Sequence, residues 1–190
     1  MNDHEEARGM ITVNLTEKML EREEIFKGRI INVHRDKVIL PNGKTTYREV
    51  VEHPGGVGIL AIDERNCVPM VTQYRYVFGR TVLEIPAGKR EKGEDPFATA
   101  IRELKEEIGA TAKEWVPLGK LIASPGCYGE ELYLFLARGL TFGETHFDED
   151  EFLETERIPF DDLLHRCLDG EIEDAKTVAA VMKVKLLLKL

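Results

Sequence analysis

The sequence has no apolar run close to the roughly 18 residues that a membrane-spanning helix requires. Residues 1–9 are polar and lack the apolar centre of a secretory signal peptide. The chain has only three cysteines, Cys67, Cys127 and Cys167, and no two of them have the CxxC spacing of redox and zinc sites. These absences predict a cytoplasmic protein with reduced cysteines and without a membrane partner.

Positive charge is also scarce, because 26 lysines and arginines face 35 acidic residues and leave a formal net charge of -9. Binding to nucleic acid depends on basic patches that displace counterions, so we expect no nucleic-acid partner. An acidic chain also repels anionic small molecules unless a cation or local arginines intervene. If the protein acts on phosphates it is therefore expected to use a metal ion, although its histidines show no metal-ligand spacing.

The apolar content, 43% of 190 residues, is enough for one compact domain with a small additional layer. We predict a flexible tail over residues 1–18, an N-terminal β-sheet subdomain over 19–55 and a main domain over 56–190. Within the subdomain, residues 19–24 are expected to form a helical turn or a lead-in. The strands expected there cover 25–33, 37–40 and 45–52, with Asn42-Gly43 as a hairpin turn.

The main domain shows a mixture of short strands and amphipathic helices. Its predicted strands cover 57–62, 68–73, 81–85, 113–123, 131–137 and 152–158. Its first predicted helix begins at Pro96, after Asp95 as N-cap, and ends at Gly109. Two further predicted helices cover 160–168 and 175–190, and Asp174 is the expected N-cap of the last one. This mixture indicates an α/β (α+β) fold in which helices cover a core built mostly of strands.

The first of these helices carries a cluster of carboxylates. Glu103 and Glu107 are four residues apart and share one face, and Glu106 lies beside Glu103. Clustered carboxylates are natural ligands for hard cations such as Mg²⁺. Arg102, four residues before Glu106, is placed to hold that side chain. An isolated cluster of this kind is more often an ordinary solvated helix face, so the surrounding residues decide between the two interpretations.

The surrounding residues, 88–110, resemble the catalytic box of the Nudix hydrolase family. That box consists of Gly, five residues, Glu, seven residues and then Arg-Glu-aliphatic-x-Glu-Glu-x-Gly with a final aliphatic residue. Its glycine and charged positions are all met, by Gly88, Glu94, Arg102, Glu103, Glu106, Glu107 and Gly109. Leu104 fills the first aliphatic position. Ala110 at the end is smaller than usual, a departure that concerns packing and not chemistry.

The resemblance implies Mg²⁺-dependent hydrolysis of a nucleoside diphosphate linked to another group, with Mn²⁺ as an alternative and two or more ions per site. It implies a Nudix fold, a mixed β-sheet core sandwiched between helices, preceded by an N-terminal antiparallel β-sheet. Glu103 and Glu107 would be the main metal ligands, with Glu106 as a ligand or a catalytic contact to metal-bound water. The backbone carbonyl of Ala87 would be a further ligand. Support of the loop and helix is implied for Gly88, Glu94, Arg102 and Gly109.

Features outside the box are similar to the ADP-ribose pyrophosphatase subfamily. Pro125 lies 16 residues beyond Gly109, where that subfamily carries a proline. The segments 73–76 and 83–88 and a three-stranded N-terminal sheet are similar as well. In such enzymes the sheet exchanges between two subunits, so the resemblance implies a homodimer. The substrate-binding residues that follow from it are Arg75, Glu84, Arg48, Tyr47, Pro125 and Gly126. Arg75 would contact phosphate or ribose, and Arg48 and Tyr47 would help to hold adenine.

The acidic run 148–151 is the remaining candidate for chemistry. It is either a solvated charge run or the source of the catalytic general base, which in this subfamily is a glutamate from such a loop. A base must come within hydrogen-bond reach of the attacking water, directly or through another water. Counting back from the helix at 160–168 favours Glu151, with Glu149 second.

Three functions remain open from the sequence. The first is cleavage of ADP-ribose into AMP and ribose 5-phosphate. The second is pyrophosphatase activity on another sugar nucleotide or dinucleotide, with GDP-mannose as the main alternative. The third is a non-catalytic domain that senses ADP-ribose, which is disfavoured because every glutamate of the box is present.

Overall fold

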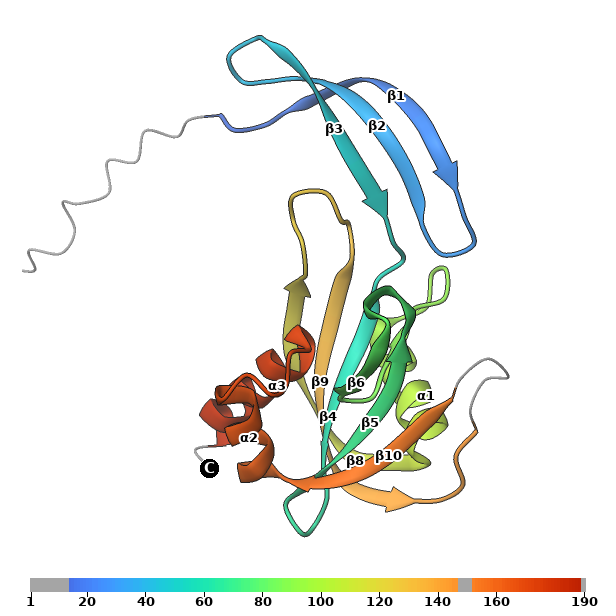
Figure 1. Ribbon diagram of the computed structural model, residues 1–190, viewed down its shortest axis with the longest axis vertical. Coiled ribbons are helices and arrows are strands. Elements are labelled where there is room, and N and C mark those ends of the chain that lie inside the picture. Colours follow the sequence, from blue (N-terminus) through green and yellow to red (C-terminus); the bar gives the residue numbers. More distant parts are fainter. Residues whose placement is uncertain (1–13, 147–151, 189–190) are drawn as a thin grey trace, which may run out of the picture. The chain divides into compact units, whose positions relative to one another are not determined.

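The computed structural model describes residues 14–146 and 152–188. The described chain forms two compact units, divided in the sequence between Glu52 and His53. Figure 1 shows a small three-stranded sheet in the first unit and strands with three helices in the second. Within the described ranges, no helix combines the length and the apolar character needed to cross a membrane.

The N-terminal unit is an antiparallel sheet in the order β1-β2-β3. Its strands are β1 (Lys18–Lys27), β2 (Asn32–Ile39) and β3 (Thr45–Glu52). The predicted hairpin turn at Asn42-Gly43 is confirmed, since Gly43 has a φ of 82° and its N–H donates to Leu40 O at 2.9 Å. A positive φ is available to glycine without steric cost.

Two predictions in this unit are wrong. Residues 19–24 form part of β1 and not a helical turn, because their charged side chains pair across to β2, as Arg22 does with Asp36. The strand predicted over 25–33 is interrupted by a turn in which the Gly28 N–H donates to Ile31 O at 2.9 Å. Cross-strand pairing therefore overrode the local sequence pattern.

The sheet is held together largely by polar contacts. His34 is 4% exposed, and its ring nitrogens lie 3.0 Å from Asp36 Oδ1 and 3.0 Å from Glu52 Oε1. Several large apolar side chains of the unit are about half exposed or more, namely Leu15, Met19, Leu20, Ile25, Phe26 and Tyr47. The unit therefore has a small interior and apolar surface.

The second unit is built on a mixed four-stranded sheet in the order β7-β4-β9-β8. The strands are β4 (Gly56–Ile62), β7 (Ala87–Lys89), β8 (Ala110–Ile122) and β9 (Glu131–Phe142). β4 and β9 are parallel, and the other pairs are antiparallel. A second sheet, in the order β10-β5-β6, contains β5 (Cys67–Arg75), β6 (Arg80–Glu84) and β10 (Leu153–Pro159), with the short 3-10 helix η1 (Tyr76–Phe78) between β5 and β6.

Helices cover both faces of the four-stranded sheet, and the alternation of side chains along β4 shows how. Val57, Ile59 and Ala61 pack with Leu104 of α1 (Pro96–Ile108) in one buried cluster. The alternate residues of β4, such as Leu60, pack in a second cluster with α2 (Phe160–Leu168) and α3 (Ala175–Leu188). Successive side chains of a strand point to opposite faces, so these clusters are the two cores. The predicted mixed sheet between helices is confirmed.

Candidate active site

The box helix α1 begins and ends where the sequence predicts. The Asp95 carboxylate accepts hydrogen bonds from the N–H groups of Phe97 at 2.9 Å and Ala98 at 3.2 Å. At the other end, Gly109 is left-handed with a φ of 62°, and its N–H donates to Lys105 O at 3.0 Å. These caps satisfy backbone groups that a helix leaves unpaired, and they fix the register of the carboxylates between them.

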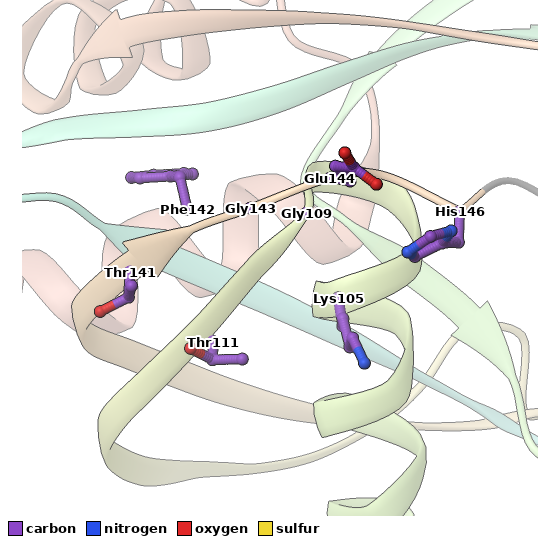
Figure 2. Close-up of a pocket in the computed structure, with 8 residues that line it drawn as sticks. All are labelled: Lys105, Gly109, Thr111, Thr141, Phe142, Gly143, Glu144 and His146. Carbon is purple, nitrogen blue, oxygen red and sulfur yellow. The ribbon is translucent and has the colours of Figure 1, made fainter.

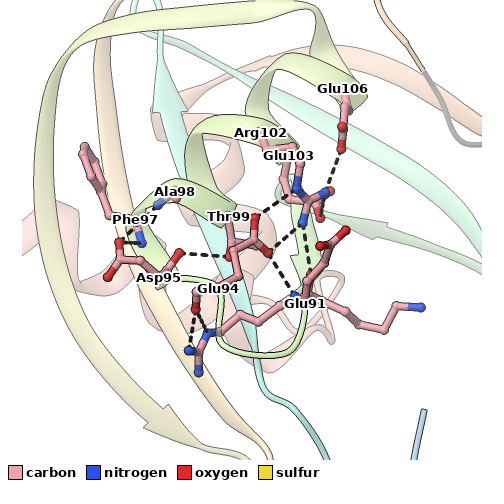
Figure 3. A network of polar contacts seen from close by, with 11 residues as sticks. Glu91, Glu94, Asp95, Phe97, Ala98, Thr99, Arg102, Glu103 and Glu106 are labelled. Atoms are coloured by element: carbon pink, nitrogen blue, oxygen red, sulfur yellow. Dashed lines mark hydrogen bonds and ion pairs between the residues drawn. The ribbon is translucent and has the colours of Figure 1, made fainter. Parts of the chain in front are cut away.

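Arg102 connects the box loop to the carboxylates of the helix (Figure 3). Its Nε and Nη2 donate to the two carboxylate oxygens of Glu94, each at 3.2 Å. Its Nη1 donates to Glu103 Oε1 at 2.7 Å and to Glu106 Oε2 at 2.8 Å. One guanidinium therefore orients three carboxylates of the box, including the Glu106 that the four-residue spacing assigned to it.

The hydrogen bond from Arg102 lowers the pKa of Glu94 from 4.5 to about 2. Because the folded pKa lies below the ordinary one, ionised Glu94 stabilises the fold above about pH 4.5, and this contribution is lost as the pH falls toward 2. We expect Glu94→Gln to lower the free energy of unfolding at pH 7, and the difference from wild type to shrink between pH 4.5 and 2. Urea unfolding at a series of pH values measures this, and a difference independent of pH would contradict it.

Two predicted metal ligands meet the backbone of β7. Glu103 and Glu107 are 6% and 3% exposed, and the Ala87 N–H donates to Glu107 Oε2 at 2.9 Å. A Cβ at Gly88 would lie 1.9 Å from Cδ and Oε1 of Glu103. Only glycine therefore lets the backbone lie against this carboxylate, which gives the first glycine of the box its physical role.

The donors at this place fit a hard divalent cation. They are carboxylate and backbone oxygens, which Mg²⁺ prefers, and the carboxylates of Glu103 and Glu107 are largely withdrawn from solvent. Within residues 14–146 and 152–188, no three His, Cys, Asp or Glu side chains are already arranged as metal ligands. Arg102 is bonded to both Glu103 and Glu106, so an incoming cation would compete with that guanidinium for them.

Arg75 and Glu84 form an ion pair at the ends of β5 and β6, in which the Glu84 side chain is buried and the Arg75 side chain is 39% exposed. Arg75 Nε donates to Glu84 Oε1 at 2.6 Å, and Nη2 donates to Oε2 at 2.8 Å. The pKa of Arg75 is raised, first by its hydrogen bond to Glu84 and further by the charges of Glu84 and Glu107. The guanidinium of Arg75 is therefore close enough to α1 for the charge of Glu107 to act on it.

Sequence reasoning missed Lys176 on α3. This lysine is 8% exposed, and its ammonium donates to Glu84 Oε2 and, at 3.0 Å, to Asp174 Oδ1. A signal was present, because Lys176, Ala180 and Val184 follow one another at four-residue spacing on one helix face, and all three are buried. A lysine in such a row needs a buried partner.

Pro125 and Gly126 lie exposed in the loop between β8 and β9. At Gly56, β4 pairs with Leu132 of β9 on one side and with Lys89 of β7 on the other. The loop that carries Pro125 therefore lies at the same end of the sheet as the beginning of the box loop.

The acidic run lies outside the described residues, and the described chain on either side of it contacts α1 and β5. The His146 N–H donates to the carbonyl oxygen of Glu106 at 3.0 Å, and Leu153 pairs with Gln73 on β5. The five residues between the two described ranges include both predicted bases, Glu149 and Glu151.

Tyr47 and Arg48 belong to β3 of the N-terminal unit. Arg48 is bonded to Glu17, through Nε at 2.9 Å and through Nη2 at 2.5 Å. Tyr47 is 56% exposed, and the guanidinium of Arg35 lies 5.1 Å from its ring centroid. Their assignment to adenine stays a prediction.

A cavity of about 340 Å³ lies beside the C-terminal end of α1 (Figure 2). Its lining residues are Lys105, Gly109, Thr111, Thr141, Phe142, Gly143, Glu144 and His146. At about 100° per residue, Lys105 projects from the side of α1 opposite Glu103 and Glu107. This cavity therefore lies on the other side of α1 from Glu103 and Glu107.

Comparisons with known proteins agree with the fold and with the box. Residues 52–181 match the NUDIX domain, and residues 17–51 match the nucleoside diphosphate sugar hydrolase N-terminal domain. An ADP-ribose pyrophosphatase of Bacillus subtilis (strain 168) is 43% identical over 175 residues, which cover 91% of this chain and 95% of that protein. A methanol dehydrogenase activator of Bacillus methanolicus is 43% identical over 172 residues, covering 90% and 93%. The crystal structure of an ADP compounds hydrolase superposes with a TM-score of 0.80 at 25% identity, covering 91% and 94% of the two chains.

Proposed function

Since the chain belongs to the NUDIX family, we propose that it is a pyrophosphatase that cleaves ADP-ribose into AMP and ribose 5-phosphate. The observation that carries this proposal is the meeting of Glu103 and Glu107 with the backbone at Ala87 and Gly88. An ordinary solvated helix face would not bury two carboxylates against the backbone. Nor would it lie so close to a glycine that any side chain there would have to displace one of the carboxylates.

The divalent cation would be held by Glu103 and Glu107, with Glu106 and the carbonyl oxygen of Ala87 as further contacts. We propose Mg²⁺, with Mn²⁺ as an alternative, and two or more ions per site. When bound, such ions neutralise charge on the pyrophosphate and lower the pKa of a coordinated water. Arg102 would keep Glu103 and Glu106 oriented until the cation arrives, and Gly88 would keep the backbone close to them.

Substrate contacts are proposed for the side chains around this centre. Arg75 would bind phosphate or ribose, because Glu84 engages its Nε and Nη2 and leaves its Nη1 edge to face a ligand. Pro125 and Gly126 would border the nucleotide at the same end of the sheet. For the base that activates water we propose Glu151, with Glu149 as the alternative, since His146, shortly before both in the sequence, is hydrogen-bonded to the carbonyl oxygen of Glu106.

We also propose a homodimer that forms through the N-terminal sheet. A three-stranded sheet with a largely polar interior and half-exposed Met19, Ile25 and Phe26 needs a partner surface, and a second copy would supply one. Arg48 and Tyr47 of that sheet would then contact adenine. A solution mass equal to the 21.6 kDa of one chain would contradict this.

A cytoplasmic location and the absence of nucleic-acid and membrane partners remain part of the proposal. All three cysteines are free in the structure, as expected in a reducing compartment. The net charge of -9 disfavours binding to nucleic acid.

The experiment that tests the function is a substrate panel with Mg²⁺. We expect kcat/KM for ADP-ribose to exceed that for GDP-mannose, NADH and diadenosine polyphosphates by about tenfold or more, the discrimination that a few binding contacts provide. A preference for GDP-mannose would favour the sugar-nucleotide alternative, which the matched N-terminal domain also supports. Failure to hydrolyse any of them would favour the third alternative, a non-catalytic domain that senses ADP-ribose.

A further inference from the structure

The first turn of α3 contacts the same carboxylate that holds Arg75. We propose that Lys176, supported by Asp174, is a positioning residue that fixes Glu84 and, through it, the substrate-binding geometry of Arg75. This inference rests on the proposed function, because it takes Arg75 to be a contact for the nucleotide. It adds a residue from the far end of the chain, on an element that carries no part of the box.

The carboxylate of Glu84 is held from two sides. Its side chain is 4% exposed, and both oxygens accept hydrogen bonds from Arg75, at 2.6 and 2.8 Å. Oε2 also accepts a hydrogen bond from Lys176 Nζ, which reaches it from α3. Two cations on different elements therefore fix the plane and the position of this carboxylate, and a bidentate guanidinium follows the plane of its partner.

Lys176 is itself anchored next to Glu84. Its Nζ donates to Asp174 Oδ1 at 3.0 Å, while Asp174 Oδ2 accepts the N–H of Thr177 at 3.0 Å and caps α3. The hydroxyl of Thr177 in turn accepts the N–H of Ile85, the residue after Glu84, at 2.9 Å. The first turn of α3 is thus hydrogen-bonded to the residue next to Glu84. This contact fixes the backbone of α3 near Glu84 and so keeps Lys176 within reach of that carboxylate.

The stem of Lys176 runs close over the main sheet on its way to Glu84. A Cβ at Gly58 of β4 would lie 3.5 Å from Lys176 Cδ and 3.0 Å from Leu134 Cδ2. A methyl group at Gly58 would therefore be in ordinary van der Waals contact with the lysine stem, which shows how closely the stem passes β4. Packing on this side limits the rotamers available to Lys176 and keeps its ammonium at the carboxylate.

The charges of the network alternate in sign, from Arg75 through Glu84 and Lys176 to Asp174. A buried ion pair adds little net stability over apolar side chains, but removal of one partner leaves an uncompensated buried charge. Loss of Lys176 would leave Glu84 and Asp174 with one fewer cation, so Glu84 would shift toward water or toward Arg75. In either case the guanidinium would lose its fixed orientation toward the site.

The test compares steady-state kinetics of Lys176→Met with those of wild type. We expect KM for the nucleotide to rise about tenfold and kcat to change by less than about threefold, as for a lost binding contact that is similar in the ground and transition states. Lys176→Arg, which keeps a cation near Glu84, should recover most of the loss. In an Arg75→Gln background, Lys176→Met should have almost no further effect on KM, because the two residues act through one contact.

A matched control separates positioning from general loosening of α3. Lys183→Met removes a hydrogen bond of 2.6 Å from the same helix to Leu118 O and does not touch Glu84. It should lower the melting temperature and leave KM unchanged. If Lys176→Met does not fold, Asp174→Asn replaces it, since asparagine still caps a helix but removes the carboxylate that anchors Lys176.

Unchanged KM in the folded Lys176 or Asp174 variant, or an equal rise of KM in the Arg75→Gln background, would overturn the inference. Unchanged KM in Arg75→Gln itself would overturn it together with the substrate role of Arg75. If wild type prefers another nucleotide of the panel, the ADP-ribose proposal fails alone. The variants are then compared on that preferred nucleotide, and the positioning role is judged there.

Discussion

Glu107→Gln is expected to reduce kcat/KM by at least about a hundredfold, because loss of a metal ligand should exceed the ten- to hundredfold that loss of an outer-shell partner costs. The fold should persist, since the amide oxygen of glutamine can still accept the hydrogen bond that Ala87 N–H donates at 2.9 Å. The substitution removes a negative charge at a position that is 3% exposed and beside the backbone at Ala87. The substitution therefore removes affinity for a cation with little change in shape.

The measurement is hydrolysis of ADP-ribose as a function of Mg²⁺ concentration, together with a melting temperature. Glu91→Gln is the matched control, because this exposed glutamate lies in the box loop and contacts Glu94 only through its backbone. It should hydrolyse ADP-ribose like wild type. Near-normal Mg²⁺-dependent turnover by Glu107→Gln would remove Glu107 from the metal ligands and leave the proposed centre without its buried carboxylate pair.

The parts of the fold that depend on local chemistry could be predicted from the sequence. The limits of α1 follow from Asp95, Pro96 and Gly109, each of which acts on backbone groups within a few residues of itself. The burial of β4 along its whole length also follows from composition, because a strand covered on both faces is apolar throughout. The hydrogen bonds of Arg102 to Glu103 and Glu106 join neighbours on one helix, so they too could be predicted from the sequence.

The parts of the fold that depend on contacts between distant segments could not be predicted from the sequence. Strand β1 has ten exposed residues and no apolar face, and only its pairing with β2 makes it a strand. The contact between Lys176 and Glu84 spans 92 residues. The closeness of Gly88 to Glu103 likewise comes from the way β7 lies against α1, and a pattern of residue types identifies that glycine without giving the reason for it.

Glu151→Gln is expected to lower kcat by about a hundredfold to ten thousandfold, the range that a positioned general base contributes. The effect should fall on kcat and not on KM, because the proton is transferred only in the transition state. The Mg²⁺ concentration for half-maximal activity should stay unchanged, which separates a base from a metal ligand such as Glu107. A base in this part of the sequence is consistent with the described residues on either side of it, since His146 is bonded to the carbonyl oxygen of Glu106 and Leu153 pairs with Gln73.

Glu149→Gln decides between the two candidate bases in the same segment. With Glu151 as the base, Glu149→Gln should retain kcat within about threefold, as expected for a charge that takes no part in proton transfer. The exposed Glu154 on β10 provides a control outside the segment, and Glu154→Gln should behave like wild type. If Glu149→Gln is the variant that loses activity, the base is two residues earlier than counting from α2 indicates. If both variants retain kcat, water is activated by a group outside the acidic run, and Glu106 becomes the next residue to substitute because Arg102 already holds it at the centre.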